Sequence, residues 1–288
     1  MAIFTNQATL SYRNGTVSSN TVTGEILEAL SVTKNALPDT YSRDDVITYV
    51  VSIVNSGATA ISGITASDDL GAYLFNTSTL VPLTYVPDSA AYYLDGVLQP
   101  TPTVTVGTNL VFSGITVPAN GNALLIYQAR ANSFAPPAGG SEIVNTVTLS
   151  GAGICNGLVA TETITASSEP SLGITKEISP STVTENGQLT YTFTVQNFGN
   201  VEATAADDLA IIDTFEPALG AVTVTYNGVV WTQGVQYNYD PATGVFSTVA
   251  GNITVPAATY MQDPVSGEWS VLPGESVIVV TGNVNCNA

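Results

Sequence analysis

Apolar and polar residues alternate along nearly all of this 288-residue chain. The segments Ile47–Ile53, Thr190–Val195 and Val222–Tyr226 are rich in Val, Ile, Thr and Tyr and change character at every residue. Because successive side chains of a strand point to opposite faces, this pattern buries one face and leaves the other in solvent. Turn pairs such as Asn14-Gly15 and Asn120-Gly121 separate the segments. The sequence therefore predicts an all-β protein made of antiparallel sandwiches, without a substantial helix.

The chain also contains two copies of one pattern. Each copy starts with a Lys and has a Pro four residues later, then a Tyr, an Asn-x-Gly and an Asp that ends an apolar strand. Self-similarity on this scale predicts two tandem domains of one fold. The matched pairs are Lys34 and Lys176, Pro38 and Pro180, Tyr49 and Tyr191, Asn55 and Asn197, and Asp68 and Asp213.

These motifs resemble the immunoglobulin-like conserved repeat of bacterial surface proteins, known as domain of unknown function family eleven. The resemblance rests on the Lys-x₃-Pro start, the strand that ends in Asn-x-Gly, the Asp at the strand end and a closing Asn-x-(Ala/Val)-Thr strand, and it covers essentially the whole chain. It implies two immunoglobulin-like sandwiches on a surface protein. With paired repeats and a mass of 29.7 kDa, the chain also looks similar to the subunits of clostridial spore appendages, which implies a fibre.

Charge and composition exclude several classes of function. With 23 acidic and 5 basic residues, the formal net charge is -18, which repels nucleic acid phosphates and anionic membranes. The chain has no His, the usual general base and metal ligand, and no nucleophile elbow or phosphate loop. We therefore expect no nucleic acid or membrane partner, no cofactor, no metal, and no enzyme activity beyond a single autocatalytic turnover.

The N-terminus has no basic stretch followed by an apolar run, so we see no signal peptide. We expect that an export signal has been removed or that lysis of the producing cell releases the protein. In both cases the expected location is extracellular, on a cell or spore surface.

The two copies differ in their closing strands. In the first copy, Ile143–Leu149 and Val159–Thr165 predict a final hairpin, and the second copy has no matching segment. The missing hairpin aligns instead with Phe4–Leu10 and Val17–Thr23, at the other end of the chain. The predicted order is a donor hairpin at 1–28, a complete sandwich at 29–169, and a second sandwich at 170–288 that lacks its last hairpin.

An incomplete sandwich exposes an open edge and part of its core, and a lone hairpin is marginally stable in water. The hairpin of one molecule can complete the second sandwich of the next, as in strand complementation. This contact propagates head to tail into a fibre unless it closes into a ring. Two alternatives stay open: the hairpin folds back on its own chain, or the chain's boundaries cut the repeats out of frame. The leading hypothesis is a self-assembling fibre subunit, and the alternative is an adhesin or surface-layer binding module on a repeat stalk.

Period-two alternation directs three polar residues of the first copy toward the core, namely Lys34, Asp68 and Asn145. These are the ingredients of an intramolecular isopeptide bond. Burial lowers the pKa of the amine and raises the pKa of the carboxyl group, so a neutral amine attacks the Asn amide while Asp68 carries the proton. The alternative is a buried ion pair of Lys34 and Asp68, with the Asn as a hydrogen-bond partner.

In the second copy the same alternation directs Lys176 and Asp213 toward the core, and the matching inward Asn is Asn6 on the displaced hairpin. The sequence therefore predicts one bond within a chain, Lys34 to Asn145, and one between chains, Lys176 to Asn6. The second bond would make the fibre covalent.

The two cysteines, Cys155 and Cys286, lie near the predicted junctions between domains or subunits. A disulfide across a junction and free thiols both remain open. Trp231 and Trp269 are expected in the core or at an interface.

Overall fold

A computed structural model describes the chain except residues 1, 27, 152, 153, 155, 156 and 285–288. Both predicted disulfide partners, Cys155 and Cys286, lie outside the described residues. Apart from one 3-10 turn, η1 (Ala205–Asp207), all regular secondary structure of the described chain is strand, so the all-β prediction is confirmed. No described helix is long and apolar enough to cross a membrane.

The chain divides into two compact units. The last change of unit along the chain falls at 164/165, whereas the predicted domain boundary is at 169/170, and two segments that lie within the first sandwich in sequence group with the second unit. The first unit comprises 1–39, 44–132 and 143–164, and the second comprises 40–43, 133–142 and 165–288.

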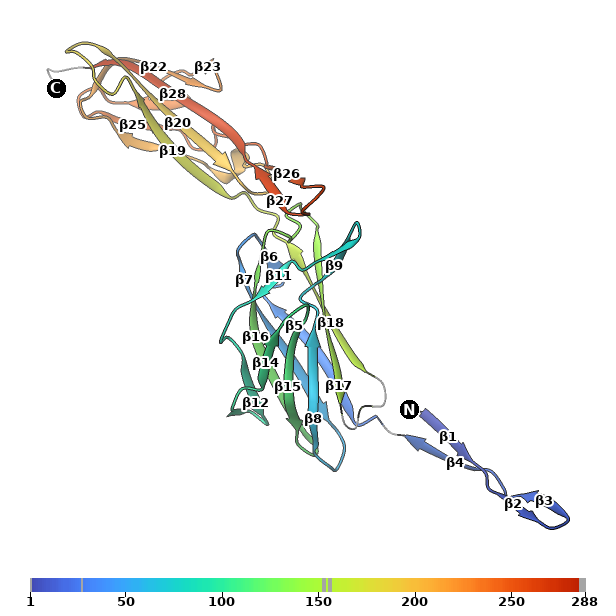
Figure 1. The fold of residues 1–288 in the computed structure, drawn as a ribbon. Helices are drawn as coiled ribbons and strands as arrows, with labels where there is room; N and C mark the ends of the chain where they lie inside the picture. Colours follow the sequence, from blue (N-terminus) through green and yellow to red (C-terminus); the bar gives the residue numbers. More distant parts are fainter. Residues whose placement is uncertain (1, 27, 152–153, 155–156, 285–288) are drawn as a thin grey trace. The chain divides into compact units, whose positions relative to one another are not determined.

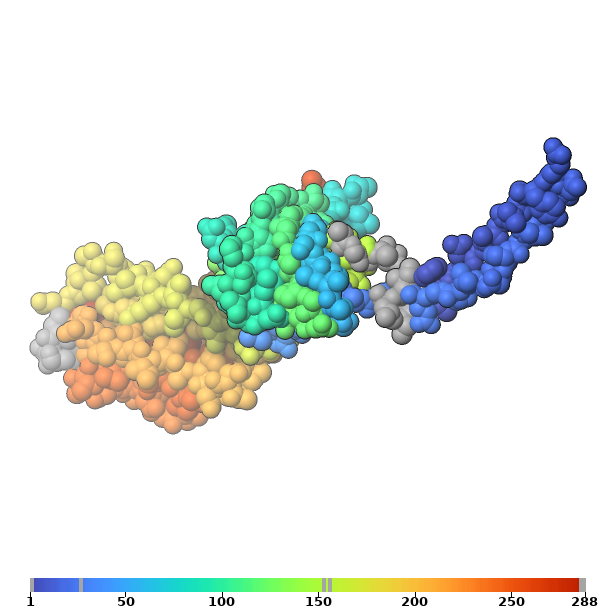
Figure 2. Space-filling model, turned by 90° about the horizontal axis from the view of Figure 1, so that it is seen from below, coloured from blue at the N-terminus to red at the C-terminus, as the bar shows by residue number. Residues whose placement is uncertain are grey.

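The N-terminal segment is a hairpin whose strands pair only with one another in the described chain (Figure 1). β1 (Ala2–Asn6) pairs with β4 (Val22–Ile26), and β2 (Thr9–Tyr12) pairs with β3 (Gly15–Ser18). The space-filling view shows this two-stranded ribbon in dark blue (Figure 2). The structure therefore confirms the predicted hairpin, with its two-residue turn at Arg13-Asn14, one residue before the predicted Asn14-Gly15.

The segment Phe4–Leu10, which aligns with Ile143–Leu149, is not one continuous strand, because β1 and β2 are separated at Gln7 and Ala8. Ser19 occupies this break: its backbone N–H donates to the carbonyl of Ala8 at 2.8 Å, and its hydroxyl accepts the Ala8 N–H at 3.0 Å. A side chain that takes the place of a backbone partner interrupts the ladder. Gly24 permits a close approach across the hairpin, because any side chain there would collide with the Phe4 ring.

The first sandwich consists of two six-stranded sheets. One has the order β13-β12-β16-β7-β5, with β11 also paired to β16, and the other has the order β14-β15-β8-β17-β18-β6. A short two-stranded sheet, β9 and β10, is separate. The strand bounds are β5 (Leu30–Leu37), β6 (Thr40–Tyr41), β7 (Val46–Asn55), β8 (Ile61–Asp68), β9 (Tyr73–Phe75), β10 (Ser78–Leu80), β11 (Leu83–Tyr85), β12 (Ala91–Leu94), β13 (Val97–Gln99), β14 (Thr103–Val106), β15 (Leu110–Val117), β16 (Gly121–Ala131), β17 (Glu142–Gly151) and β18 (Leu158–Ala166).

The second sandwich has fewer strands. A five-stranded sheet with the order β19-β20-β28-β22-β23 is accompanied by a three-stranded sheet, β21-β25-β24, and by a hairpin of β26 and β27. The strand bounds are β19 (Leu172–Ser179), β20 (Gln188–Asn197), β21 (Ile212–Thr214), β22 (Leu219–Tyr226), β23 (Val229–Val230), β24 (Tyr237–Tyr239), β25 (Val245–Thr248), β26 (Thr259–Gln262), β27 (Trp269–Leu272) and β28 (Gly274–Val284).

Aromatic rings pack between the sheets of each sandwich. In the first, Phe112 of β15 lies 5.4 Å from Tyr127 of β16, measured between ring centroids. In the second, Phe193 of β20 lies 6.1 Å from Phe246 of β25. Inward residues alternate with solvent-facing ones along β7 and β20, as the period-two pattern predicts. Trp231 is buried in the second core.

The strand β8 and its counterpart β21 differ in what pairs beside them. β8 has β15 on one side and β17 on the other. β21 pairs with β25 and is the terminal strand of its sheet in the described chain. The second sandwich therefore has an open edge where the first has its closing hairpin.

The first strands of the two sandwiches show the same difference in burial. On β5 the inward residues Leu30 and Ala36 are 7% and 8% exposed. On β19 the side chains of Leu172, Ile174 and Ile178 are 44%, 55% and 46% exposed. Because these residues face the core position in the repeat, part of the second core is open to solvent.

Candidate cross-linking site

Lys34 and Asp68 meet in the centre of the first sandwich, from opposite sheets. Lys34 comes from β5 and Asp68 from the end of β8, and both side chains are fully buried. The Lys34 Nζ lies 2.6 Å from Oδ2 of Asp68, and the Tyr127 hydroxyl donates to the same oxygen at 2.6 Å. The backbone N–H of Leu70 donates to the other carboxyl oxygen at 3.0 Å. The predicted inward orientation of Lys34 and Asp68 is confirmed.

Burial acts on both charges of this pair. Desolvation lowers the pKa of Lys34, against the opposing attraction of Asp68. Desolvation likewise raises the pKa of Asp68, although Lys34, Tyr127 and the Leu70 N–H favour its charged form. Both shifts favour moving the proton from the ammonium to the carboxylate. Both shifts act in the direction of a neutral amine beside a protonated acid, which is the form that a nucleophilic lysine needs.

Asn145 lies on β17 and is completely buried, as predicted. Neither its Nδ2 nor its Oδ1 has a hydrogen-bond partner of normal geometry in the described chain. Burial raises the pKa of Tyr49 and of Tyr127, and the neighbouring Asn145 amide opposes this by a smaller lowering effect on each. An unpaired buried amide costs about 1–3 kcal/mol, so a purely structural role is a poor account of this residue.

The second copy has the same Lys and Asp on its open face. Lys176 forms an ion pair with Asp213, and their side chains are 40% and 20% exposed. The Lys176 Nζ lies 4.6 Å from the ring centroid of Tyr191 and 5.5 Å from that of Phe215. The lysine thus points toward the core face, where the cover that β17 and β18 give to the first sandwich has no counterpart in the described chain.

The remaining predicted member, Asn6, lies on β1 of the hairpin. It pairs across the ribbon with Val22, and its side chain is exposed. The structure therefore brings Lys34 and Asp68 together with Asn145 nearby, and it pairs Lys176 with Asp213.

Sequence reasoning missed the hydroxyls of Tyr49 and Tyr127 as parts of this site. The two rings stack at 5.5 Å, from paired positions on β7 and β16. The apolar-polar alternation predicts that both tyrosine side chains face the core, and a hydroxyl buried in a core usually has a hydrogen-bond partner. That requirement was the available signal.

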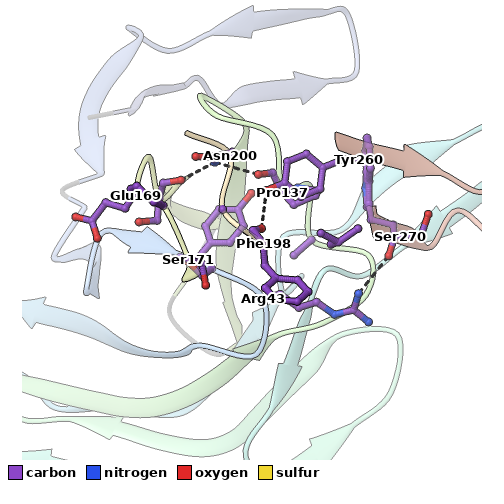
Figure 3. Close-up of a pocket in the computed structure, with 16 residues that line it drawn as sticks. Arg43, Pro137, Glu169, Ser171, Phe198, Asn200, Tyr260 and Ser270 are labelled. Atoms are coloured by element: carbon purple, nitrogen blue, oxygen red, sulfur yellow. Dashed lines mark hydrogen bonds between the residues drawn. The ribbon is translucent and has the colours of Figure 1, made fainter. Parts of the chain in front are cut away.

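A separate cavity of about 760 Å³ lies in the second unit (Figure 3). Several of its polar side chains are engaged with backbone carbonyls: Asn200 donates to Ser167 at 2.6 Å and to Pro137 at 3.1 Å, and Tyr260 donates to Phe198 at 3.0 Å. Trp269 also lines the cavity. These contacts connect the loops around the cavity to one another, and we assign no function to it.

The two ion pairs should differ sharply in their effect on stability. In a chain lacking residues 1–28, Asp68→Ala leaves Lys34 buried without its partner and should cost at least about 3–5 kcal/mol in the free energy of unfolding. Asp213→Ala removes the partner of Lys176, whose side chain is 40% exposed and therefore screened by solvent, and should cost at most about 1 kcal/mol. Denaturant titration followed by circular dichroism measures both. Equal losses would contradict the assigned burial.

No family model matches this sequence, and no curated protein matches it. Solved structures give distant similarities. The collagen-binding domain of a Staphylococcus aureus adhesin is 14% identical, with a TM-score of 0.29, and the match covers 49% of this chain and 99% of that one. The major pilin BcpA of Bacillus cereus is 11% identical, with a TM-score of 0.35 and coverage of 98% and 75%. The pilus backbone RrgB of Streptococcus pneumoniae is 12% identical, with a TM-score of 0.34; the match covers 85% of this chain and 55% of that one.

Proposed function

We propose that this protein is the subunit of a surface fibre that grows when the N-terminal hairpin of one molecule completes the second sandwich of the next. The observation that carries the proposal is the division of the repeated site. The first copy holds its Lys, Asp and Asn within one sandwich, whereas the second holds Lys176 and Asp213 on an open face. The Asn that matches by sequence, Asn6, is exposed on the hairpin.

The open edge of β21 indicates how the hairpin would enter. In the first sandwich Val147 of β17 pairs with Asp68 of β8. The alignment of Asn6 with Asn145 puts Ala8 opposite Asp213 in the completed second sandwich. Asn6 then lies two residues before Ala8, just as Asn145 lies two residues before Val147. Backbone hydrogen bonds of β-strand addition would supply the pairing, and the side chains would set its register.

Apolar surface on both pieces would drive the association. The hairpin exposes Ile3, Phe4 and Leu10 by 68%, 52% and 66%, and β19 exposes its core-facing residues. Fully burying one such side chain stabilises by about 1.5–3 kcal/mol. Because donor and acceptor are different surfaces, each added subunit exposes a new pair of ends and growth continues.

The lysine sites would then make the fibre covalent. The neutral Lys amine attacks Cγ of the Asn side chain, the Cγ–Nδ2 bond breaks, and the departing nitrogen takes up the proton that the amine loses, by way of the Asp. The product is a secondary amide plus one ammonia, without any change of oxidation state. We assign Lys34, Asp68 and Asn145 to the bond within a chain, and Lys176, Asp213 and Asn6 to the bond between chains. The net charge of -18 keeps such fibres apart on a cell or spore surface.

Denaturing gel electrophoresis tests the proposal directly. Fibres boiled in detergent and reductant should give a ladder of covalent oligomers, because reduction removes disulfides but leaves amides. Intact mass should show the loss of one ammonia for each bond. Boiled fibres that run only as monomer of unchanged mass would contradict the covalent part of the proposal.

A further inference from the structure

Tyr49 occupies a central place in the first site without any assigned role. It lies on β7, its side chain is fully buried, and the Lys34 Nζ lies 4.9 Å from its ring centroid. Its hydroxyl has no hydrogen-bond partner of normal geometry in the described chain. A buried hydroxyl left unpaired costs about 1–3 kcal/mol, so its presence requires an explanation.

The neighbouring donors are already used. Oδ2 of Asp68 accepts from Lys34 and from the Tyr127 hydroxyl, and Oδ1 accepts from the Leu70 N–H. The Tyr127 proton is therefore committed to the carboxyl group. The polar atoms left over in the site are the Tyr49 hydroxyl and the two ends of the Asn145 amide.

These leftover groups belong to one buried cluster. Lys34 lies over the Tyr49 ring and pairs with Asp68, and Asp68 lies opposite Val147, two residues after Asn145. The Asn145 amide lowers the pKa of the Tyr49 phenol through a hydrogen-bonding interaction, while burial raises that pKa far more, so the hydroxyl keeps its proton. The contact falls outside normal hydrogen-bond geometry in the unreacted state. Catalytic hydrogen bonds are often long or poorly aligned in the unreacted state and tighten as the reaction proceeds.

We infer that the Tyr49 hydroxyl is a catalytic donor of the cross-linking reaction, and that it stabilises the negative charge on Oδ1 of Asn145. The inference rests on the proposed function. As the Lys34 Nζ–Cγ bond forms, the carbonyl electron pair moves onto Oδ1, and Tyr49 donates to it. When the pair returns, the Cγ–Nδ2 bond breaks and ammonia leaves with the proton passed through Asp68. Tyr49 keeps its proton throughout.

The second copy retains this tyrosine but not its neighbour. Tyr191 aligns with Tyr49, and Lys176 lies over its ring. The residue paired with Tyr49 is Tyr127, whereas the residue paired with Tyr191 is Val280. Both sites therefore have the tyrosine that we assign to the Asn oxygen, Tyr49 or Tyr191. Only the first site has a second tyrosine, Tyr127, whose hydroxyl donates to the Asp.

Tyr49→Phe tests the inference in the full-length chain, because it removes the hydroxyl and keeps the ring beside Lys34. Intact mass is followed over time in newly synthesised protein, and circular dichroism confirms folding. We expect ammonia loss from the first site to slow by about 10²–10³-fold, the usual effect of removing one such donor. Tyr85→Phe, a buried tyrosine of the same sandwich, is the matched control and should react at the normal rate.

The second site provides an independent test that does not depend on the folding of Tyr49→Phe. Full-length donor chains carrying Lys176→Arg are mixed with full-length acceptor chains carrying Asn6→Ala, so that donor hairpins can react only with acceptor lysines. The appearance of covalent dimer is timed on denaturing gels. Adding Tyr191→Phe to the acceptor should slow this reaction to a similar degree, without reducing non-covalent capture of the donor.

The outcomes separate this inference from the proposed function. Bonds that form in the parent chain and form as fast in both phenylalanine variants would overturn the role of the hydroxyl and leave the fibre proposal standing. Slower capture of the donor together with slower bonding would point to a structural role and would also overturn it. A parent chain that loses no ammonia would overturn the cross-link and this inference together.

Discussion

Removing residues 1–28 should abolish fibre formation completely while both sandwiches stay folded. The deletion takes away the donor hairpin, whose strands pair with no other strand of the described chain, so each sandwich keeps its own contacts. The open second sandwich then has nothing to complete it. Electron microscopy and light scattering at equal protein concentration measure the effect, and circular dichroism monitors the strand content.

A matched control separates the hairpin's presence from its apolar contacts. Phe4→Asp keeps the full length but puts a charge where a core-facing side chain is proposed, and it should suppress assembly almost as strongly as the deletion. Thr16→Asp, close to the hairpin turn, should assemble normally. Fibres that persist after the deletion would rule out strand exchange.

The second large effect should separate assembly from covalent bonding. Lys176→Arg keeps a positive charge beside Asp213, but a guanidinium group does not lose its proton in proteins and cannot act as the nucleophile. We expect fibres of normal appearance that fall apart to monomers when boiled in detergent, a complete loss of the ladder. Assembly driven by strand pairing does not require the bond.

Lys34→Arg is the natural control, because it affects the bond within a chain alone. Its fibres should still give a full ladder. Each subunit should lose one ammonia fewer than a subunit of the parent, because the bond within the chain does not form. A ladder from Lys176→Arg fibres would show that another residue makes the link between chains.

Much of the fold was predictable because a strand's period of two is a local property. Alternation alone identifies Lys34, Asp68 and Asn145 as core-facing, and all three are buried. The interruption at Gln7 and Ala8 was not predictable in this way. It depends on the hydrogen bonds that Ser19 makes to Ala8 from the opposite side of the hairpin.

The site itself was predicted less completely. A Lys and an Asp on an apolar strand face are unusual, so the sequence identifies them as site residues. Tyr49 and Tyr127 fit the ordinary core pattern, and that pattern does not indicate what their hydroxyls bind. The solvent exposure of Lys176 was also not predictable from the local sequence. It depends on which strands cover β19, and the repeat pattern of β19 itself matches that of the buried β5.

The positions of the two lysines have a mechanical consequence. Lys34 lies on the first strand of its sandwich and Asn145 on β17, shortly before the chain leaves through β18 toward Lys176 on β19. With both proposed bonds formed, a pull along the fibre would run from residue 6 to 34, cross to 145, continue to 176 and enter the next subunit. Residues 35–144 and those after 176 would lie outside this covalent path. The pulling force would then not be transmitted through the backbone of most of each sandwich. The fibre would bear force without unfolding its sheets.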